Sequence, residues 1–429
     1  MSKRSAPASG TRSLPGPDDI HRQILPNGIT ILTRPNFNSP SVSLSGYLQA
    51  GSLLEPDDKL GMADFTASAL TRGTSRYSFD EIYNRLESVG ASLGYDSGMH
   101  TTGFSGRALV EDLALLLELL SETLRQPVFP EAEVEKLRSQ LLTGLAIRAQ
   151  DTSDMADLSF DEILFRDHPY ARPEDGQPDT VKSIRRADLE DFHQRRFGPR
   201  GLVLAVVGAV EPSRAVDLVS AALGDWQNPQ QMELPPLPEF RPLDETTRRH
   251  IVIAGKSQAD LVIGTSGPRR KAPEFMAASL GNSVLGQFGM MGRVGDAVRE
   301  KSGLAYYAYS NLSAGVGPGT WTVSAGVNPS NLKKAADLIM KELKAFVKDG
   351  VTEEELADSQ ANFVGRLPLS MESNAGVANA LLNIERHDLG LDYYRRYPEL
   401  VRAVHPKDVL EAARQHIDPE RLAVASAGP

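Results

Sequence analysis

Hydrophobic positions along the chain follow two different periods, which alternate in blocks. Short runs that are β-branched, or apolar at every second residue, predict strands. Six such runs are 29–33, 42–48, 202–207, 251–254, 261–265 and 321–325. Longer stretches with leucine, valine or phenylalanine three and four residues apart predict amphipathic helices, most clearly 111–125 and 331–348. This order predicts an α+β fold in which a mainly antiparallel sheet carries helices on one face.

The plan of strands and helices occurs twice. Four residues of the first half recur in the second half with the same spacing: Pro199, Leu202, Ala205 and Gly208 match Pro419, Leu422, Ala425 and Gly428. A helix start at Phe129-Pro130-Glu131 resembles one at Val351-Thr352-Glu353. The distance in sequence between these two helix starts is nearly the same as that between Pro199 and Pro419. Chance similarity between amphipathic helices would explain one pair. Two pairs in near-equal register indicate an internal duplication.

The duplication predicts two homologous domains with a linker between them. Residues 225–243 contain five prolines, which cannot donate backbone hydrogen bonds and interrupt helices. We therefore expect a flexible tail at 1–19, an α+β domain at 20–224, a proline-rich linker at 225–243 and a second α+β domain at 244–429. A chain of 429 residues also exceeds the roughly 250–300 residues that one hydrophobic core usually serves.

Composition narrows the classes of partner. Hydrophobic residues make up 41% and charged residues 24% of the chain, the balance of a soluble globular protein. A formal net charge of −10 disfavours nucleic acid and anionic lipid, since both are bound by clustered lysine and arginine. No apolar run is long enough for a membrane span, and segment 1–19 lacks the apolar stretch of a secretory signal. The sequence thus predicts a cytoplasmic protein without a membrane or nucleic-acid partner.

The chain is poor in metal ligands. It has no cysteine, so thiolate zinc sites and thiol nucleophiles are excluded. Its eight histidines are widely scattered, and no two of them lie within one helical turn of each other in sequence. A helix-borne zinc site needs ligands three or four residues apart. We therefore expect this chain to bind no metal.

Residues 51–82 read GSLLEPDDKLGMADFTASALTRGTSRYSFDEI. This segment resembles the opening motif of the pitrilysin and insulysin family of zinc metallopeptidases, whose relatives include the mitochondrial processing peptidase. In that family a glycine-serine and an acidic-proline pair precede a helix with H-x-x-E-H, and a glycine-threonine follows. The matching residues here are Gly51, Ser52, Glu55, Pro56, Gly61, Gly73 and Thr74. The turn His168-Pro169-Tyr170 also resembles a family turn.

The residues that bind zinc in the family are missing. Aligned on the motif, Asp64 and Ser68 stand at the two histidine positions and Ala67 stands at the position of the glutamate general base. The family's third ligand is a glutamate on a later helix, and the matching region, 136–161, contains no glutamate. A single carboxylate would not retain zinc, because catalytic sites use three protein ligands. The resemblance therefore implies a degenerate zinc motif.

A second part of the family pattern is present. The family carries an arginine and a tyrosine in its second half that project into the zinc site, and Arg299 and Tyr306 have that spacing. The resemblance implies that Arg299 positions substrate and that Tyr306 stabilises the oxyanion of the tetrahedral intermediate. Tyr307 and Tyr309 are neighbouring candidates, but only Tyr306 fits the family position. Without the resemblance, an ordinary helix followed by a strand would explain both residues.

Together these features imply a non-catalytic subunit of a heterodimeric zinc metalloendopeptidase. It would bind peptide and act in trans on a homologous subunit with an intact H-x-x-E-H, which would hold the zinc. The glycine-rich segment 314–319, with Gly315, Gly317 and Gly319, is either a mobile substrate-binding loop or only a hairpin turn. Two alternatives remain: a catalytically silent scaffold of the same fold, and a self-associating chaperone that binds peptides.

Overall fold

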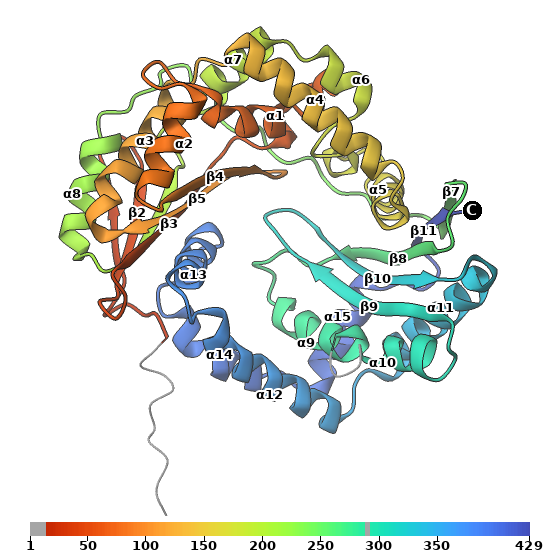
Figure 1. The fold of residues 1–429 in the computed structure, drawn as a ribbon. Helices are drawn as coiled ribbons and strands as arrows, with labels where there is room; N and C mark the ends of the chain where they lie inside the picture. The colour runs from red at the N-terminus through yellow and green to blue at the C-terminus, as the bar shows by residue number, and fades with distance from the viewer. Residues whose placement is uncertain (1–13, 288–291) are drawn as a thin grey trace, which may run out of the picture. The chain divides into compact units, whose positions relative to one another are not determined.

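The chain is organised in two compact units, neither of which is continuous in sequence. The structure is a computed structural model that describes residues 14–287 and 292–429 (Figure 1). Unit 1 comprises Met1–Thr143, Glu174–Pro235 and Arg366–Tyr397, and unit 2 comprises Gly144–Pro173, Pro236–Gly365 and Pro398–Pro429. Segments 144–173 and 366–397 thus each belong to the unit that is built mainly from the other half of the chain. The sequence indicated two continuous domains and contained no sign of this exchange.

Unit 1 contains a six-stranded sheet in the order β1-β2-β6-β3-β5-β4. Only the β2–β6 pair is parallel, and the other neighbours are antiparallel. The strands are β1 (His21–Ile24), β2 (Thr30–Pro35), β3 (Ser41–Leu48), β4 (Ser92–Ser97), β5 (Thr102–Leu109) and β6 (Val203–Gly208).

Unit 2 contains a five-stranded sheet in the order β7-β11-β8-β10-β9. Only β7 and β11 are parallel. The strands are β7 (Thr247–Val252), β8 (Ala259–Gly267), β9 (Ala305–Ser313), β10 (Gly319–Val327) and β11 (Ala423–Gly428). This order reproduces β2-β6-β3-β5-β4, and both ends of β11 follow those of β6 by the offset that separates Pro419 from Pro199. The duplication is therefore confirmed in the topology of the sheets.

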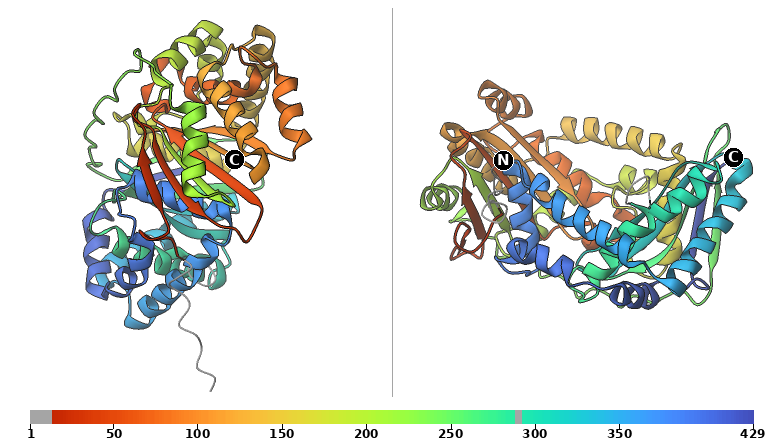
Figure 2. Two further views of the ribbon diagram at one scale, coloured as in Figure 1. Left: turned by 90° about the vertical axis from the view of Figure 1, so that its left-hand side faces the viewer. Right: turned by 90° about the horizontal axis from the view of Figure 1, so that it is seen from below.

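Helices of unit 1 cover both faces of its sheet. Helices α3 and α8 pack on one face, against β5 and β2 respectively, and α13 packs on the other face, against β3 and β6. The left view of Figure 2 shows α8, in bright green, crossing in front of the strands. The helices are α1 (Met62–Ala69), α2 (Phe79–Ser88), α3 (Leu113–Arg125), α6 (Pro178–Ser183), α7 (Arg186–Arg196), α8 (Pro212–Leu223) and α13 (Asn374–Arg386).

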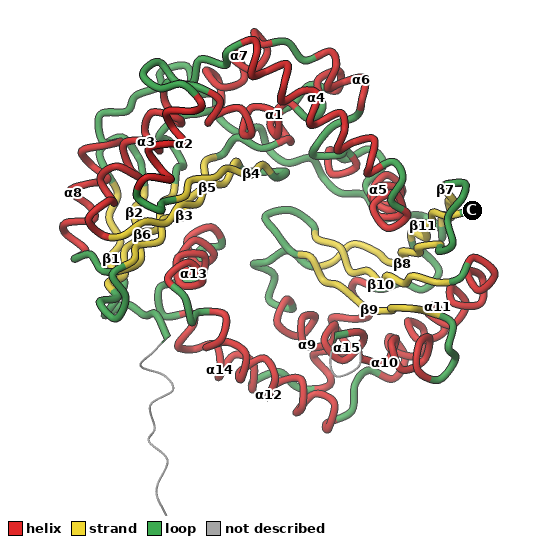
Figure 3. Tube along the Cα trace, viewed as in Figure 1, coloured by secondary structure: helices red, strands yellow, loops and turns green. Residues whose placement is uncertain are grey.

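Unit 2 has the same layering. Helices α9, α11 and α15 lie on one face of the sheet, and α5 lies on the other, against β8 and β11 (Figure 1). The helices are α5 (Thr152–Leu164), α9 (Phe275–Gly286), α10 (Gly292–Gly295), α11 (Leu332–Asp349) and α15 (Pro406–His416). The chain crosses between the units within α4 (Glu131–Arg148), α12 (Glu353–Ser370) and α14 (Tyr393–Arg402). Figure 3 separates strands, in yellow, from helices, in red.

The two helices that exchange units are equivalent in the duplication. Both ends of α13 follow those of α5 by the offset that separates Val351 from Phe129, and each helix packs on the sheet built from the opposite half of the chain. Helix α5 buries Phe160, Ile163 and Leu164 against alanines of β11 and Val262 of β8. Since burial of each such large side chain stabilises by about 1.5–3 kcal/mol, α5 is an integral part of the core of unit 2. The α+β class with mainly antiparallel sheets is confirmed, with one helix added on the second face of each sheet.

Short turns of helix connect these elements. They are the 3-10 turns η1 (Ser52–Leu54), η2 (Asp57–Lys59), η3 (Leu70–Arg72), η4 (Val110–Asp112), η5 (Pro169–Ala171) and η7 (Pro329–Asn331), and the π-helical turn η6 (Asp296–Glu300). Residues 225–243 contain neither helix nor strand. Within the described part of the chain, no helix combines the length and the apolar character that a membrane crossing requires.

Candidate functional site

The carboxylate of Glu55, a residue of the sequence motif, caps the N-terminus of helix α1. Glu55 is only 4% exposed, and its two oxygens accept hydrogen bonds from the backbone N–H of Gly61, at 2.9 Å, and of Ala63, at 2.5 Å. Gly61 precedes the helix with a φ of 90°, in the left-handed region that favours glycine. A carboxylate at this position satisfies free N–H groups of the first turn and complements the helix dipole. Glu55 and Gly61 therefore shape the helix that carries the motif.

The outer glycines of the motif allow close backbone contacts. A Cβ atom at Gly51 would lie 2.4 Å from the carbonyl oxygens of Gly98 and Met99. Gly73 has a φ of 149°, and a Cβ there would lie 2.9 Å from Cγ of Pro130. These retained residues are explained by the local fold alone, without any catalytic role.

The three residues that the sequence alignment placed at the zinc-motif positions lie on helix α1. Asp64 and Ser68 are half-buried and separated by one helical turn, and Ala67 is 2% exposed. Burial, together with repulsion from the nearby carboxylates of Asp175 and Glu174, raises the pKa of Asp64 to about 6. This donor set does not fit zinc, since it lacks an imidazole and offers a carboxylate, a hydroxyl and a methyl group. Among residues 14–287 and 292–429, no three histidine, aspartate or glutamate side chains are grouped to hold a metal ion.

Arg299 lies in the π-helical turn η6 of unit 2. Its side chain is 35% exposed, and its Nε is 3.5 Å from a carboxylate oxygen of Glu300. The Gly303 amide donates to the Arg299 carbonyl, and Gly303 itself has a φ of 61°, which reverses the chain towards β9. Single π-helical turns often occur at functional sites. Arg299 is thus a partly exposed cation at the end of a helix, a few residues before the strand of Tyr306.

Tyr306 lies at an irregularity of the edge strand β9. Tyr307 pairs with Gly326 and Ala305 pairs with Val327 of β10, so Tyr306 is an extra residue without a partner in the ladder. Such a β-bulge redirects the side chains around it. The Tyr306 side chain is 63% exposed, and no residue of the described chain hydrogen-bonds to its hydroxyl. A phenol O–H is therefore available at the surface of unit 2.

The two neighbouring tyrosines differ from Tyr306 in their contacts. The Tyr307 hydroxyl donates a hydrogen bond to Asp260 of β8. Burial, followed by this contact with Asp260, raises the pKa of Tyr307. The Tyr309 ring lies 5.7 Å from the Tyr307 ring, and Tyr309 is 40% exposed. Tyr307 therefore has a structural contact, whereas the Tyr306 hydroxyl has none within the described chain.

The glycine-rich segment 314–319 connects β9 to β10. A Cβ at Gly317 would lie 2.1 Å from the Tyr170 hydroxyl oxygen, and a Cβ at Gly319 would lie 1.8 Å from the Ser313 carbonyl oxygen. Gly315 has open space around its Cα, and its carbonyl accepts from the Arg270 amide. The segment is the loop of a hairpin, and two of its three glycines are needed for close packing.

The candidate residues are divided between the two units. Arg299 and Tyr306 lie in unit 2, and Asp64, Ala67 and Ser68 lie in unit 1. Sequence reasoning missed Asp260, which is 2% exposed. The sequence did contain a signal for it, since Asp260 is a lone carboxylate inside the apolar run 259–263 of β8. A carboxylate buried in such a run needs hydrogen-bond donors from neighbouring residues.

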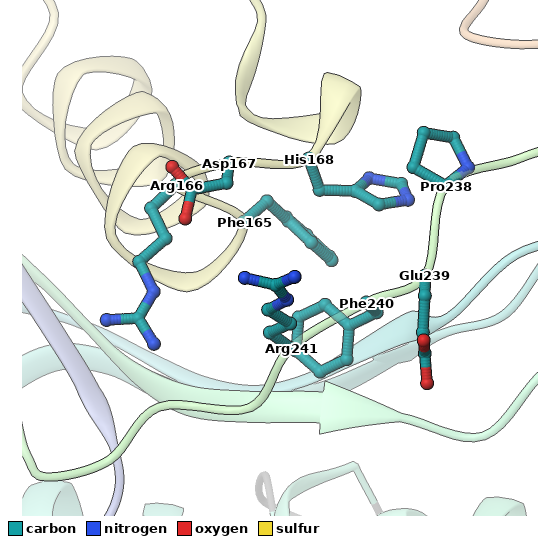
Figure 4. A pocket seen from close by; sticks show the side chains of 8 residues that line it. All are labelled: Phe165, Arg166, Asp167, His168, Pro238, Glu239, Phe240 and Arg241. Carbon is teal, nitrogen blue, oxygen red and sulfur yellow. The ribbon is translucent and has the colours of Figure 1, made fainter.

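Unit 2 also contains a cavity of about 300 Å³ between segments 165–168 and 238–241. Figure 4 shows the lining: Phe165, Arg166, Asp167, His168, Pro238, Glu239, Phe240 and Arg241. The lining carries two guanidinium groups and two carboxylates, and Arg166 pairs with Asp244, which lies outside the lining.

His168 of the cavity caps the turn η5. Its Nδ1 accepts from the Tyr170 amide at 3.2 Å, which confirms the predicted turn. Its buried Nε2 has no hydrogen-bond partner of ordinary geometry among the described residues. Burial lowers the pKa of His168, and the backbone of Pro238 opposes that shift.

Sequence comparisons with known proteins all point to the same family. A sequence model described as "Insulinase (Peptidase family M16)" matches residues 30–174, and one described as "Peptidase M16 inactive domain" matches residues 183–363. An uncharacterized zinc protease of Mycobacterium bovis is 27% identical over 412 residues, covering 95% of this chain and 93% of the relative. The beta subunit of the mitochondrial-processing peptidase of Saccharomyces cerevisiae is 25% identical over 380 residues, covering 82% of this chain and 79% of the relative.

Solved structures agree with this assignment. A peptidase M16 inactive domain from Pseudomonas fluorescens superimposes with a TM-score of 0.88 at 26% identity, covering 96% of this chain and 98% of that one. A protease from Helicobacter pylori has the same fold, with a TM-score of 0.88 at 19% identity over 97% of this chain and 100% of that one. From its sequence motif, its duplicated fold and these matches, the chain belongs to the insulinase family, peptidase family M16.

Proposed function

We propose that this chain is the non-catalytic subunit of a heterodimeric zinc metalloendopeptidase. It binds peptide substrate and supplies Arg299 and Tyr306 to the active site of a homologous subunit that has an intact H-x-x-E-H motif. The observation that carries the proposal is the contrast between the residues at the zinc-motif positions and Tyr306. Helix α1 carries neither the two histidines nor the glutamate general base of the family motif, while Tyr306 is 63% exposed and its hydroxyl has no hydrogen-bond partner in the described chain. The similarity to a protein named as a subunit of a processing peptidase supports a partner.

Arg299 and Tyr306 suit the chemistry of peptide hydrolysis. The tetrahedral intermediate carries a developing negative charge on the former carbonyl oxygen, which a phenol O–H stabilises by donating a hydrogen bond. A guanidinium group donates two parallel hydrogen bonds and can hold a peptide carbonyl in place. Zinc in the partner supplies the Lewis acid and the activated water. This chain contributes the donors and the peptide-binding surface, and it binds neither metal nor cofactor itself.

The test uses the purified chain, a homologous H-x-x-E-H subunit and an unstructured fluorogenic peptide. The chain alone should show no turnover, and the mixture should cleave the peptide. Tyr306→Phe should lower kcat by about 10²–10³-fold, the usual cost of removing one oxyanion donor. Tyr309→Phe is the matched control, since it removes an exposed hydroxyl from the same strand, and it should leave kcat unchanged.

Arg299→Ala tests the positioning role separately. Loss of a group that holds the substrate should raise KM, lower kcat, or both, while the two chains still associate. Stoichiometric zinc binding and peptide cleavage by this chain alone would overturn the proposal. If turnover of the mixture is unaffected by both Arg299→Ala and Tyr306→Phe, the chain is a scaffold of the same fold.

A further inference from the structure

Three residues on neighbouring strands form a line across the sheet of unit 2. Gly326 of β10 pairs with Tyr307 of β9 on one side and with Asp260 of β8 on the other. Adjacent strands are about 4.8 Å apart, so β9 and β8 are separated by roughly 10 Å. The Tyr307 side chain spans this gap over β10, and its hydroxyl donates to Asp260. The contact thus ties the edge strand directly to the centre of the sheet.

Gly326 provides the space for this crossing. A Cβ at this position would lie 2.4 Å from Cε1 of Tyr307 and 3.0 Å from Oδ1 of Asp260. Both distances are shorter than an ordinary carbon contact of about 3.5–4.0 Å. The tyrosine ring can therefore lie against the strand only because residue 326 has no side chain.

Asp260 is held from several sides. It is 2% exposed, and besides Tyr307 it accepts hydrogen bonds from the Thr152 hydroxyl and, at 2.9 Å, from Nε2 of Gln258. Thr152 is the first residue of α5. Hydrogen bonds to an ionised carboxylate in a low-dielectric interior are stronger than neutral ones. The carboxylate therefore fixes Tyr307 to both the sheet and the start of α5.

Tyr306 is the residue next to this anchor. As the extra residue of the bulge, it has no pairing of its own in the ladder with β10, and its exposed side chain has no hydrogen-bond partner within the described chain. Its position depends on what holds its neighbours. Tyr307 is the neighbour with a buried, charge-assisted contact.

We propose that Tyr307 and Asp260 are positioning residues whose hydrogen bond across Gly326 fixes the bulge that exposes Tyr306. The effect of this hydrogen bond on the bulge can be tested on the chain without a partner. Its effect on turnover rests on the proposed function, so the two effects are tested by separate experiments.

Hydrogen exchange of the chain alone tests the anchor. Tyr307→Phe removes only the hydroxyl, and we expect exchange of the amides at 305–308 to become at least about tenfold faster, with distant strands unchanged. Asp260→Asn removes the charge at constant shape and should have the same local effect. Tyr309→Phe is the control and should leave exchange as in the wild type. Unchanged exchange in both anchor variants, with folding verified by circular dichroism, would overturn the inference.

Turnover with an H-x-x-E-H partner tests the consequence. Tyr307→Phe should lower kcat about tenfold with little change in KM, and the effect should vanish when Tyr306→Phe is already present, since Tyr307 acts through Tyr306. A loss of equal size in both backgrounds would show a general structural role and would refute positioning. Faster exchange in Tyr307→Phe, combined with normal turnover of Tyr306→Phe, would support the anchor and refute the proposed function alone.

Discussion

Asp64→Asn should stabilise unit 1 at neutral pH, although Asp64 is predicted to align with a zinc ligand of the family. The pKa of Asp64 rises from 3.8 to about 6, mainly because the carboxyl is buried, with Asp175 and Glu174 adding repulsion. A raised folded-state pKa means that the unfolded chain ionises first as pH increases. The stability linked to Asp64 is therefore fully present below pH 4 and is lost as pH rises through about 6. A shift of roughly two units corresponds to at most about 3 kcal/mol.

The assay is urea unfolding followed by tryptophan fluorescence. The chain has two tryptophans, Trp226 in unit 1 and Trp321 in unit 2. A Trp321→Phe background therefore reports on unit 1 alone. We expect Asp64→Asn to raise the free energy of unfolding by about 1–3 kcal/mol at pH 7.5 and to have little effect at pH 4. Asp217→Asn, at an exposed position of α8, is the control. If Asp64→Asn destabilises unit 1 equally at both pH values, the Asp64 carboxylate has a favourable contact and the reasoning fails.

Three further substitutions test other contacts by the same unfolding assay. Glu55→Gln should destabilise unit 1 by about 2 kcal/mol, because an amide cannot accept both N–H groups that begin α1; an unchanged midpoint would contradict the capping role. Gly326→Ala, followed through Trp321 in a Trp226→Phe background, should cost about 1–3 kcal/mol, and less when Tyr307→Ala is also present; an equal cost in both backgrounds would exclude a clash with the tyrosine ring. Glu355 forms an ion pair with Arg293 at 2.5 Å. Burial alone would raise the pKa of Glu355, but hydrogen bonds from Arg293 and Thr352 lower it below 4.5. Its contribution is thus present above about pH 4.5 and lost on acidification. Glu355→Gln should cost about 1–2 kcal/mol at pH 7, and this cost should decrease as the pH falls below 4.5; a cost independent of pH would argue against the pair.

Much of the fold could be predicted from the sequence because its signals are local. The six predicted strand runs overlap β2, β3, β6, β7, β8 and β10, and the repeated Pro-Leu-Ala-Gly spacing leads into β6 and β11. The exchange of α5 and α13 could not be predicted. An amphipathic pattern shows that one face of a helix is buried, but it does not specify the sheet that buries it.

The candidate site was also predicted only in part, because some of its features depend on contacts between residues far apart in the sequence. The roles of Glu55 and Gly61 at the start of α1 follow from short-range geometry, and the motif identified that helix correctly. The bulge at Tyr306 depends on pairing with β10, and strict alternation along β9 gave no sign of it. The link from Tyr307 to Asp260 joins residues 47 positions apart, a separation at which residue periodicity carries no information.

The exchanged helices also determine how the protein can be made and divided. During synthesis the first half emerges without α13, so one face of its sheet lacks its helix until residues 374–386 have also been made. Cutting the chain in the linker would not yield two independent domains, because each fragment would keep a helix whose apolar side belongs to the other fragment. The two fragments should instead reassemble when mixed, each completing the other's core. In this protein the internal repeat marks ancestry, whereas each compact unit is completed by a helix from the other half of the chain.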